Sequence, residues 1–317
     1  MNLSEFLREV ERQPAWTRGG ERAPHKRLAI LFALGRALAG RRLAKFAEAE
    51  GPLRELLERF GPVRAQQHPE QPVWRLARRG EESVSWWELV GAEQVPSDSA
   101  GNPSIVAMRT HLSFGLSQQC ADHFLSHPEE AWLAAHGIAA SVVPETMRDE
   151  LLSATLGDGS SDHFDSATLP DPELVVRELA PTWRVVRDPR FSARVLRAYD
   201  ERCVVCEVAP RHRARLFGIE AAHIRWAAAQ GPDEIWNGLS MCRMHHAGFD
   251  RGAFTLDENL RVRVANQLAR DERTRALFHA YDGREIRPPS DASLAPRPEM
   301  LRWHHREVFR DPAALSG

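Results

Sequence analysis

The chain has 317 residues, of which 43% are hydrophobic and 27% charged, and its formal net charge at pH 7 is −2. This length allows two domains with cores of their own, and the near-neutral balance excludes a globally basic nucleic-acid binder. No apolar run approaches the ~20 residues of a membrane span, and the charged N-terminus lacks the apolar centre of a secretory signal, so we expect a cytoplasmic protein without membrane partners.

The first half of the chain predicts a mainly helical domain. Residues 26–60 contain two amphipathic runs, each closed by glycine, and further helices are expected over 117–136 and 144–156. Residues 72–90 alternate around a glycine-containing turn, which indicates two short strands of a hairpin. We therefore expect a mixed α and β domain, mostly helical, over residues 1–157.

The second half predicts a smaller domain after a linker. Residues 158–182 begin within the polar, turn-rich stretch GDGSSDHFDSATLPDPEL, which has the composition of a linker. An amphipathic segment, FSARVLRAYDERC, lies near the start of a second domain over 183–285. Residues 286–317 read as a proline-rich tail with a short helix at most. The fold class expected for the whole chain is α+β.

Three of the four cysteines cluster in the second domain. Cys203 and Cys206 form C-x2-C, and Cys242 and His245 form C-x2-H. In a reduced compartment such pairs indicate a metal rather than disulfides, and tetrahedral Zn²⁺ accepts three thiolates and one imidazole. We predict a structural zinc; the alternative is buried thiols beside a surface histidine. Cys120 stands alone and is most simply a small buried side chain.

Two further histidines and an asparagine lie around the cysteine pairs. The stretch IEAAHIRW ends a strand-like run on His223, which alone would be an ordinary core strand. Asn237 follows 14 residues later and His246 another 9. On a helix His246 points about 100° away from its neighbour His245, so something other than zinc must occupy it.

The stretches EAAHI and WNGLSMCRMHH together resemble HNH nucleases of the ββα-metal class, with His245 in place of the second zinc cysteine of the second pair. GFDRGAFTLDENLRVRV resembles the hairpin that often follows such domains. The resemblance implies that His223 is the general base that activates water, that Asn237 orients the loop and the His223 ring, and that His246 holds a catalytic Mg²⁺, Mn²⁺ or similar ion. The products would carry 5′ phosphate and 3′ hydroxyl ends.

The second protein ligand of that ion is left open by the sequence. Many relatives place Asp or His just before the base, where this chain has Ala222. Glu220 is one candidate, and Asp250 is another, although Asp250 also reads as a turn residue before Gly252. The phosphates of nucleic acid are expected to meet arginines around the site, each equally readable as a solvated residue: Arg211, Arg213, Arg215, Arg225 and Arg243.

The stretches APHKRLAILFALGRALAG and QQHPEQPVWRL resemble the sulfur-binding domain that is fused to HNH domains in phosphorothioate-dependent, McrA-like restriction endonucleases. Together the two resemblances cover roughly residues 20–156 and 183–265. The resemblance implies that His68, Pro69 and Pro72 line a pocket for the sulfur, above Trp74 in the core. An apolar pocket would discriminate because sulfur is less strongly hydrated than oxygen.

The same resemblance implies a basic grip on the modified backbone. His25 and Lys26 begin the long helix, where a helix N-terminus already favours anions. Arg75, Arg78 and Arg79 would add phosphate contacts from the predicted hairpin, or else form a solvated turn. Family members often carry R-G-G-F where this chain has HLSFGLS, with Ser113 and Phe114 in those positions, which allows a different or relaxed base preference.

Three hypotheses for function follow from the sequence. The preferred one is a modification-dependent restriction endonuclease that binds phosphorothioated double-stranded DNA and cuts nearby, as a homodimer because two strands must be cut. The second keeps the nuclease but reads a methylated or otherwise modified base, for which Trp86 and Trp87 could form an aromatic cage. The third is a non-catalytic DNA-binding regulator stabilised by zinc.

Overall fold

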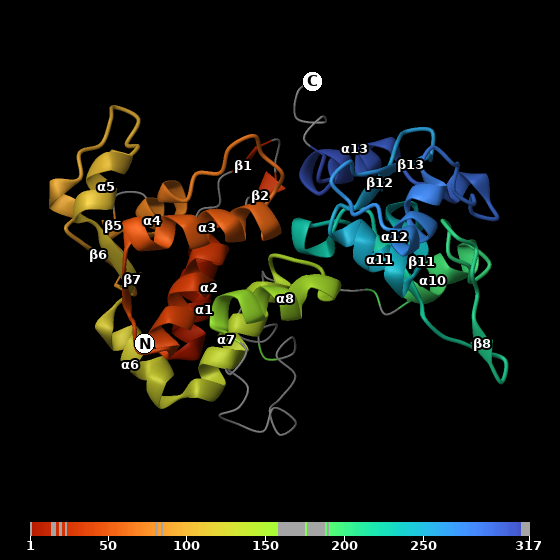
Figure 1. Cartoon of the computed structure of the whole chain (residues 1–317). Coiled ribbons are helices and arrows are strands. Elements are labelled where there is room, and N and C mark those ends of the chain that lie inside the picture. The colour runs from red at the N-terminus through yellow and green to blue at the C-terminus, as the bar shows by residue number, and fades with distance from the viewer. Residues whose placement is uncertain are drawn as a thin grey trace. The chain divides into compact units, whose positions relative to one another are not determined.

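The structure is a computed structural model in which the chain forms two compact units (Figure 1). Unit 1 comprises Met1–Pro62, Gln66–Val143 and Arg148–Arg184, and unit 2 comprises Val63–Ala65, Pro144–Met147 and Val185–Gly317. The described residues are 2–13, 17–18, 21–22, 24–79, 82–83, 85–157, 175, 188 and 190–311. For residues 17–18, 21–22, 78–79 and 82–83 the description covers the backbone alone. Apart from residue 175, the predicted linker 158–182 lies outside these ranges.

Unit 1 is mainly helical, as predicted. Two helices form over 26–60, separated by an unpredicted short strand, 117–136 becomes two helices that extend to Ala140, and 144–156 forms one helix. The elements are α1 (Leu3–Arg12), β1 (Thr17–Arg18), β2 (Glu21–Arg22), α2 (His25–Leu38), β3 (Leu43–Lys45), α3 (Phe46–Phe60), α4 (Glu70–Leu76), β4 (Arg78–Arg79), β5 (Glu82–Ser83), β6 (Trp87–Val90), η1 (Ala92–Gln94), α5 (Ile105–His111), β7 (Ser113–Leu116), α6 (Gln118–Ser126), α7 (Pro128–Ala140) and α8 (Glu145–Leu156).

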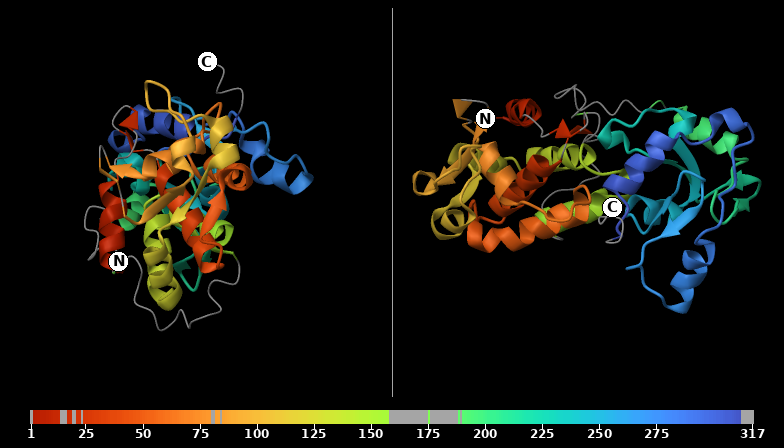
Figure 2. Two further views of the ribbon diagram at one scale, coloured as in Figure 1. Left: turned by 90° about the vertical axis from the view of Figure 1, so that its left-hand side faces the viewer. Right: turned by 90° about the horizontal axis from the view of Figure 1, so that it is seen from above.

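Helix α2 is the centre of unit 1. Eight of its fourteen residues are buried, on more than one side of the helix, because α3, α4, α6 and α7 all pack against it. Figures 1 and 2 show α2 and α7 side by side. At Gly35 a Cβ atom would meet the carbonyl oxygen of Thr155 at 1.8 Å, so only glycine allows the close approach of α2 to the end of α8. This helix positions His25 and Lys26 at its first turn.

The predicted hairpin over 72–90 is only partly right. Residues 70–76 form helix α4, with Val73 and Leu76 buried at helical spacing, and the hairpin is confined to β4 and β5. Strand β6 instead joins an antiparallel sheet of order β3-β7-β6. A short apolar segment fits the strand period of 2 residues and the helix period of 3.6 residues about equally well, so the pattern did not distinguish a strand from a helix. Strand β6 pairs with β7, which lies farther along the sequence.

Unit 2 is built on two antiparallel strands followed directly by a helix. Its elements are α10 (Phe191–Ala198), β8 (Arg211–His212), β9 (Arg215–Leu216), β10 (Ile219–His223), η4 (Ala227–Ala229), η5 (Ile235–Asn237), β11 (Gly238–Cys242), α11 (Arg243–Asp250), β12 (Phe254–Leu256), β13 (Val262–Val264), α12 (Glu272–Leu277), η6 (His279–Tyr281), η7 (Ala292–Leu294) and α13 (Pro298–Glu307). Strands β10 and β11 pair from Ile219 opposite Cys242 to His223 opposite Gly238. With α11 they form the predicted ββα arrangement.

The C-terminal stretch contributes to the core of unit 2 rather than trailing from it. Ile286, Met300 and Leu301 are buried in the same cluster as Ala222, which is fully buried. The expected tail from residue 286 therefore contains helix α13 and packs against the unit. In the described part of the chain no helix is long and apolar enough to cross a membrane.

Candidate active site

Four side chains of unit 2 converge as the cysteine spacing predicts. The Sγ atoms of Cys203, Cys206 and Cys242 and a ring nitrogen of His245 all lie within 4.8 Å of one another. Cys203 and Cys242 Sγ are 3.4 and 3.1 Å from His245 Nδ1, and Cys206 Sγ is 4.0 Å from Cys242 Sγ. A tetrahedral ion with metal–sulfur bonds near ~2.3 Å spaces its ligands at about these separations. The cluster could hold a metal ion.

The surroundings of His245 are those of a closed structural site. Its Nε2–H donates to the carbonyl of Leu277 at 2.8 Å, which leaves Nδ1 to face the three thiols. The rings of Phe254, Phe278 and Tyr281 meet the imidazole edge-on. His245 is 2% exposed, so the alternative of a surface histidine is wrong.

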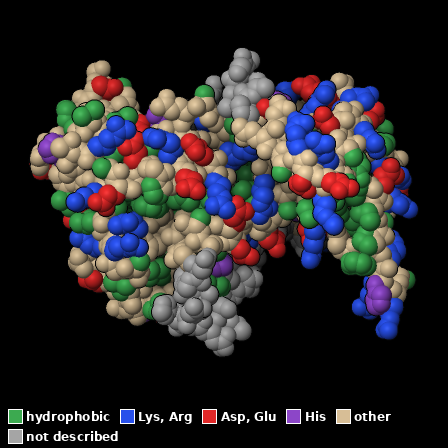
Figure 3. All heavy atoms as spheres, viewed as in Figure 1, with side chains coloured by type: hydrophobic (Ala, Val, Ile, Leu, Met, Phe, Trp, Pro, Cys, Tyr) green, Lys and Arg blue, Asp and Glu red, His purple; other side chains and the backbone are tan. Residues whose placement is uncertain are grey.

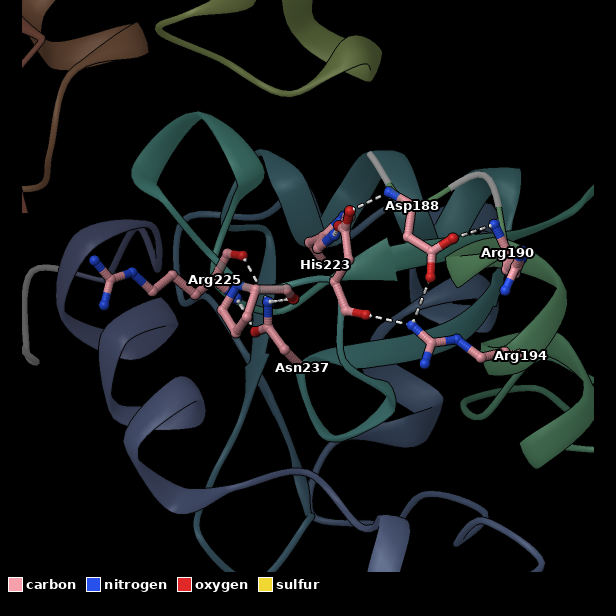
Figure 4. Close-up of polar contacts among 8 residues, drawn as sticks. Asp188, Arg190, Arg194, His223, Arg225 and Asn237 are labelled. Atoms are coloured by element: carbon pink, nitrogen blue, oxygen red, sulfur yellow. Dashed lines mark hydrogen bonds and ion pairs between the residues drawn. The ribbon is translucent and has the colours of Figure 1, made fainter. Parts of the chain in front are cut away.

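His223 lies at the end of β10 (Figure 4), and its ring is held on two sides. Its Nε2 is 2.7 Å from Asp233 Oδ1, and its face stacks on Phe191 of α10, with ring centroids 4.0 Å apart. The side chains of His223 and Asp233 are 15% and 14% exposed. The imidazole is therefore fixed, mostly shielded from water, and paired with a carboxylate.

Asp233 is itself held by backbone and side-chain donors. Its Oδ2 accepts the backbone N–H of Asp188, and its carbonyl accepts a bond from Arg194 at 2.6 Å. Arg194 also binds the Asp188 carboxylate at 3.1 Å (Figure 4). The sequence analysis missed Asp233. The signal was a pair of acidic residues, Asp233 and Glu234, in the loop between His223 and Asn237, and a loop of that length has too many conformations to predict the contact.

Asn237 is fully buried and fastens the loop around His223. Its Oδ1 accepts the backbone N–H of Arg225, and its Nδ2 donates to the carbonyls of Arg225 and Pro232. At Gly231 a Cβ atom would lie 1.8 Å from the Arg225 carbonyl oxygen, so the turn requires glycine. Asn237 thus fastens the loop, but these three bonds all go to backbone atoms and the ring of His223 is bound by Asp233.

His246 projects from α11 between two carboxylates. Its Nδ1 is 3.0 Å from Glu220 Oε2, and its Nε2 is 3.2 Å from Asp250 Oδ2. Burial of the ring acts to lower its pKa, but the hydrogen bonds and charges of Asp250 and Glu220 prevail and raise the pKa of His246 to about 9. Arg243 binds the other oxygen of Glu220 at 2.7 Å.

Asp250 is the last residue of α11 rather than the turn residue that the sequence allowed. Its side chain is 1% exposed, and its Oδ2 accepts both His246 and the hydroxyl of Thr146, which belongs to unit 2. Ala222 points into the core, so the position before His223 offers no ligand. An imidazole with carboxylate oxygens suits Mg²⁺ or Mn²⁺. Glu220 contacts one ring nitrogen of His246 and Asp250 contacts the other. A metal ion bound to one nitrogen would therefore leave the other nitrogen in contact with the remaining carboxylate.

The predicted arginines are mostly exposed. Strands β8 and β9 form a hairpin whose turn residues, Arg213 and Ala214, have φ of 48° and 62°, the conformation of a tight two-residue hairpin turn. In Figure 3 the tip of this hairpin, at the lower right, carries side chains in the blue of Lys or Arg and the purple of His. Arg211 pairs with Glu201, Arg225 donates to the Ala229 carbonyl, and the side chain of Arg243 is 79% exposed.

In unit 1, the structure brings two of the predicted basic residues together. Lys26, on the first turn of α2, donates to Gln13 at 3.3 Å. Burial, with the positive charge of Arg75 on the adjoining helix α4, lowers the pKa of Lys26 to about 8. Arg75 also binds the Ala100 carbonyl and the Asn102 side chain, so it is fixed in place. His25 begins the same helix α2, and the side chains of Arg78 and Arg79 lie outside the described residues.

The predicted pocket residues lie at the start of α4. The side chain of His68 is 54% exposed, and its Nδ1 is 3.0 Å from Oε1 of Glu70, a carboxylate that is 6% exposed. Pro69 caps the helix and Pro72 lies in it, and both are buried. Trp74 is only half-buried, so its expected place in the core is wrong; its neighbours on the helix, Val73 and Leu76, take that place.

Trp86 and Trp87 are core residues, at 0% and 4% exposure. Trp87 donates to the Val73 carbonyl at 3.1 Å, and its ring stacks near Phe114 of β7, which is also fully buried. A base could not reach either tryptophan without unfolding this core. Cys120 is buried too, as expected, and burial raises the pKa of its thiol to about 12.

The site of unit 2 therefore has the architecture of a ββα nuclease: a strand ending on histidine, a buried asparagine in the loop, and a helix beside a Cys₃His cluster. Comparison with known families agrees. Residues 203–257 match the HNH endonuclease family, and residues 3–157 match the ScoMcrA-like DNA sulfur-binding domain. The chain is thus an HNH DNA endonuclease that carries a DNA sulfur-binding domain of the ScoMcrA-like family.

Several solved structures are similar to the chain. The sulfur-binding domain of ScoMcrA complexed with phosphorothioated DNA aligns at 26% identity over 48% of this chain and 98% of that one, with a TM-score of 0.41. The Type IV phosphorothioation-dependent restriction endonuclease ScoMcrA aligns at 16% identity over 94% and 99%, with a TM-score of 0.39. The modification-dependent TagI restriction endonuclease aligns at 24% identity over 38% of each chain, with a TM-score of 0.29. No curated protein matches the chain in sequence.

Proposed function

We propose that this protein is a modification-dependent restriction endonuclease that binds phosphorothioated double-stranded DNA through unit 1 and hydrolyses phosphodiester bonds near the modification with unit 2. The observation that carries the proposal is the union of a sulfur-binding domain and an HNH domain in one chain. A binding domain that reads one modified linkage gives the nuclease a target that unmodified DNA lacks. Cutting both strands needs two catalytic centres, so the active form is a homodimer or two bound copies.

Hydrolysis begins with His223 as the general base. The imidazole takes a proton from a water molecule, whose oxygen forms a bond to phosphorus while the bond to the 3′ oxygen breaks. The 3′ oxygen receives a proton from solvent, which gives 5′ phosphate and 3′ hydroxyl ends. Asn237 holds the backbone on both sides of the loop, and the stacked Phe191 keeps the ring plane fixed.

Two metal sites belong to the proposal. Cys203, Cys206, Cys242 and His245 hold a structural Zn²⁺. His246, with Glu220 or Asp250, holds a catalytic Mg²⁺ or Mn²⁺, which when bound supplies positive charge to stabilise the pentavalent phosphorus and the departing oxygen. Glu220 and His223 both belong to strand β10 and are three residues apart, about 10 Å along a strand.

We expect unit 1 to recognise the modified DNA in two ways: positive charge binds the backbone, and a weakly polar surface favours sulfur over the more strongly hydrated oxygen. Lys26 and Arg75 repel each other in the free protein, so an anionic backbone between them relieves that repulsion. The exposed ring of His68 offers a weakly polar surface that sulfur tolerates better than a strongly hydrated oxygen. Pro69 and Pro72 are buried at the start of α4 and support this ring, and the proposal adds His25 from α2 and Arg78 and Arg79 from the hairpin of β4 and β5.

The alternative of a modified-base reader loses its main support. Its candidate cage, Trp86 and Trp87, is buried in the core, and Trp87 is hydrogen-bonded there. The alternative of a regulator that only binds DNA does not explain why an imidazole at the end of β10 is paired with a mostly covered carboxylate, because docking on DNA needs no base.

The proposal is tested by a cleavage assay on matched duplexes that carry phosphorothioate, 5-methylcytosine or neither at one defined site, with Mg²⁺, Mn²⁺ or Ni²⁺. We expect cleavage of the phosphorothioated duplex alone. Cleavage of the methylated duplex instead would establish the base-reader alternative, and no nicking with any metal would favour the regulator.

Replacing His68 by alanine is expected to reduce the preference for sulfur over oxygen by about tenfold, because the exposed ring forms part of the weakly hydrated surface. The ratio of dissociation constants for the two duplexes measures this preference. His127→Ala, which removes another exposed histidine of unit 1, is the control and should keep the ratio. An unchanged ratio in His68→Ala would remove His68 from the recognition surface.

Binding is expected to weaken with pH through Lys26. Its pKa of about 8 means that the ammonium is present at pH 7 and is largely lost by pH 9. The affinity for phosphorothioated duplex should therefore fall by about tenfold between these values, the loss of one charged hydrogen bond. Lys26→Arg should flatten this dependence because guanidinium stays charged, whereas Lys45→Arg, at the exposed second lysine, should not. Fluorescence anisotropy without added divalent metal measures both.

A further inference from the structure

The pair of His223 and Asp233 is built more firmly than a surface ion pair. Both side chains are about 85% covered, and the Nε2 to Oδ1 distance is 2.7 Å. The other carboxylate oxygen of Asp233 accepts the backbone N–H of Asp188. With both oxygens bound, the carboxylate cannot rotate away from the imidazole without losing a hydrogen bond.

The groups around this pair hold the segment that carries Asp233 in place. Arg194 on α10 donates to the backbone carbonyl of Asp233 and to the Asp188 carboxylate (Figure 4). Phe191, one helical turn before Arg194, stacks on the imidazole. Helix α10 thus fixes the ring from its face through Phe191 and the backbone of Asp233 through Arg194.

An imidazole that is bonded to a carboxylate at one nitrogen has a defined tautomer. Because Asp233 accepts a hydrogen bond at Nε2, the neutral ring carries its proton there. The lone pair that receives a proton is then on Nδ1. When Nδ1 gains that proton the ring becomes positive, and the carboxylate at 2.7 Å stabilises the new charge in a shielded setting.

We propose that Asp233 is a positioning residue for DNA hydrolysis, which holds His223 in the Nε2–H tautomer and stabilises its protonated form. The inference rests on the proposed role of His223 as the base. In the step concerned, a water O–H bond breaks, its proton bonds to Nδ1 of His223, and the water oxygen forms the bond to phosphorus as the bond to the 3′ oxygen breaks. Asp233 takes no proton and touches no substrate atom.

Substitution of Asp233 by asparagine separates its charge from its shape. The amide oxygen of Asp233→Asn can still accept Nε2–H, but the negative charge is gone, so the protonated ring is less stable. We expect the plateau of the cleavage rate to fall about 10–100-fold and its acid limb to move to lower pH by about one unit. Asp233→Glu should recover part of the rate, whereas Asp233→Ala should not. A merely structural carboxylate would leave the acid limb in place.

A control with the same chemical change is Asp282→Asn, at an exposed residue whose Oδ1 accepts the backbone N–H of Val264 and which lies outside the centre. It should keep the wild-type pH profile. Zinc content and thermal unfolding show whether each variant is folded. Should Asp233→Asn fail to fold, long-range ¹H–¹⁵N NMR of the zinc-loaded wild-type chain decides: a proton on Nε2 of neutral His223 supports the proposal, and a proton on Nδ1 overturns it.

The outcomes also distinguish this inference from the proposed function. If His223→Ala is inactive while Asp233→Asn keeps the wild-type rate and acid limb, His223 is the base and Asp233 does not position it. If His223→Ala still cleaves, the assignment of the base is wrong, and the inference is overturned with it.

Discussion

Replacing His223 by alanine is expected to reduce DNA cleavage by about 10²–10⁴-fold, the contribution of a positioned general base. Binding of phosphorothioated DNA should be unchanged, because the proposed recognition surface lies in unit 1. The fold of unit 2 should also persist, since His223 is at a strand end and Ala222 and Ile224 provide the buried neighbours. The measurement is a single-turnover cleavage rate together with a dissociation constant for the same duplex.

His279→Ala is a suitable control for that experiment. It removes an imidazole from the same unit, at η6, where Nε2 binds the Ala269 carbonyl and no residue of the proposed centre is involved. It should cleave at the wild-type rate. Lost binding with retained cutting in His223→Ala would reverse the assignment of the two units, and full activity would show that another group activates water.

Removing one zinc ligand should have the largest effect on stability. Cys203→Ser is expected to unfold unit 2, because structural zinc in small domains contributes on the order of 10 kcal/mol or more, comparable to the whole stability of a domain. The cluster ties the loop after α10 to the start of α11, and thereby fixes the position of β11 and of His246. Unit 1 has its own core around α2 and should remain folded.

Hydrogen exchange resolved by peptide and zinc content measure this prediction. Protection should be lost over β10, β11 and α11 and retained over α2 and α7. Cys120→Ser, the same substitution at the buried cysteine of unit 1, is the control and should keep one zinc per chain. A Cys203→Ser protein with protected β10 and β11 would show that the cluster does not stabilise the domain.

The sequence predicted the structure best where the pattern involves residues that are close together along the chain. The C-x2-C and C-x2-H pairs permit few geometries, and the structure brings all four side chains together. Long periodic segments such as 26–60 also became helices where expected. The sequence failed at 72–90 because short apolar runs fit two periods, and at Trp74 because one aromatic residue gives no information about which face is covered.

By itself, the sequence determined that this protein has a helical first domain and a Cys₃His cluster, because ligand spacing and helical periodicity are set by neighbours along the chain. The ββα nuclease followed from the resemblance of EAAHI and WNGLSMCRMHH to HNH nucleases. Only the tertiary structure decided that Asp233 pairs with His223, that His246 lies between Glu220 and Asp250, and that Trp86 and Trp87 are closed to a base. These facts depend on contacts between segments that loops connect, and loop conformation is fixed by packing rather than by local propensity.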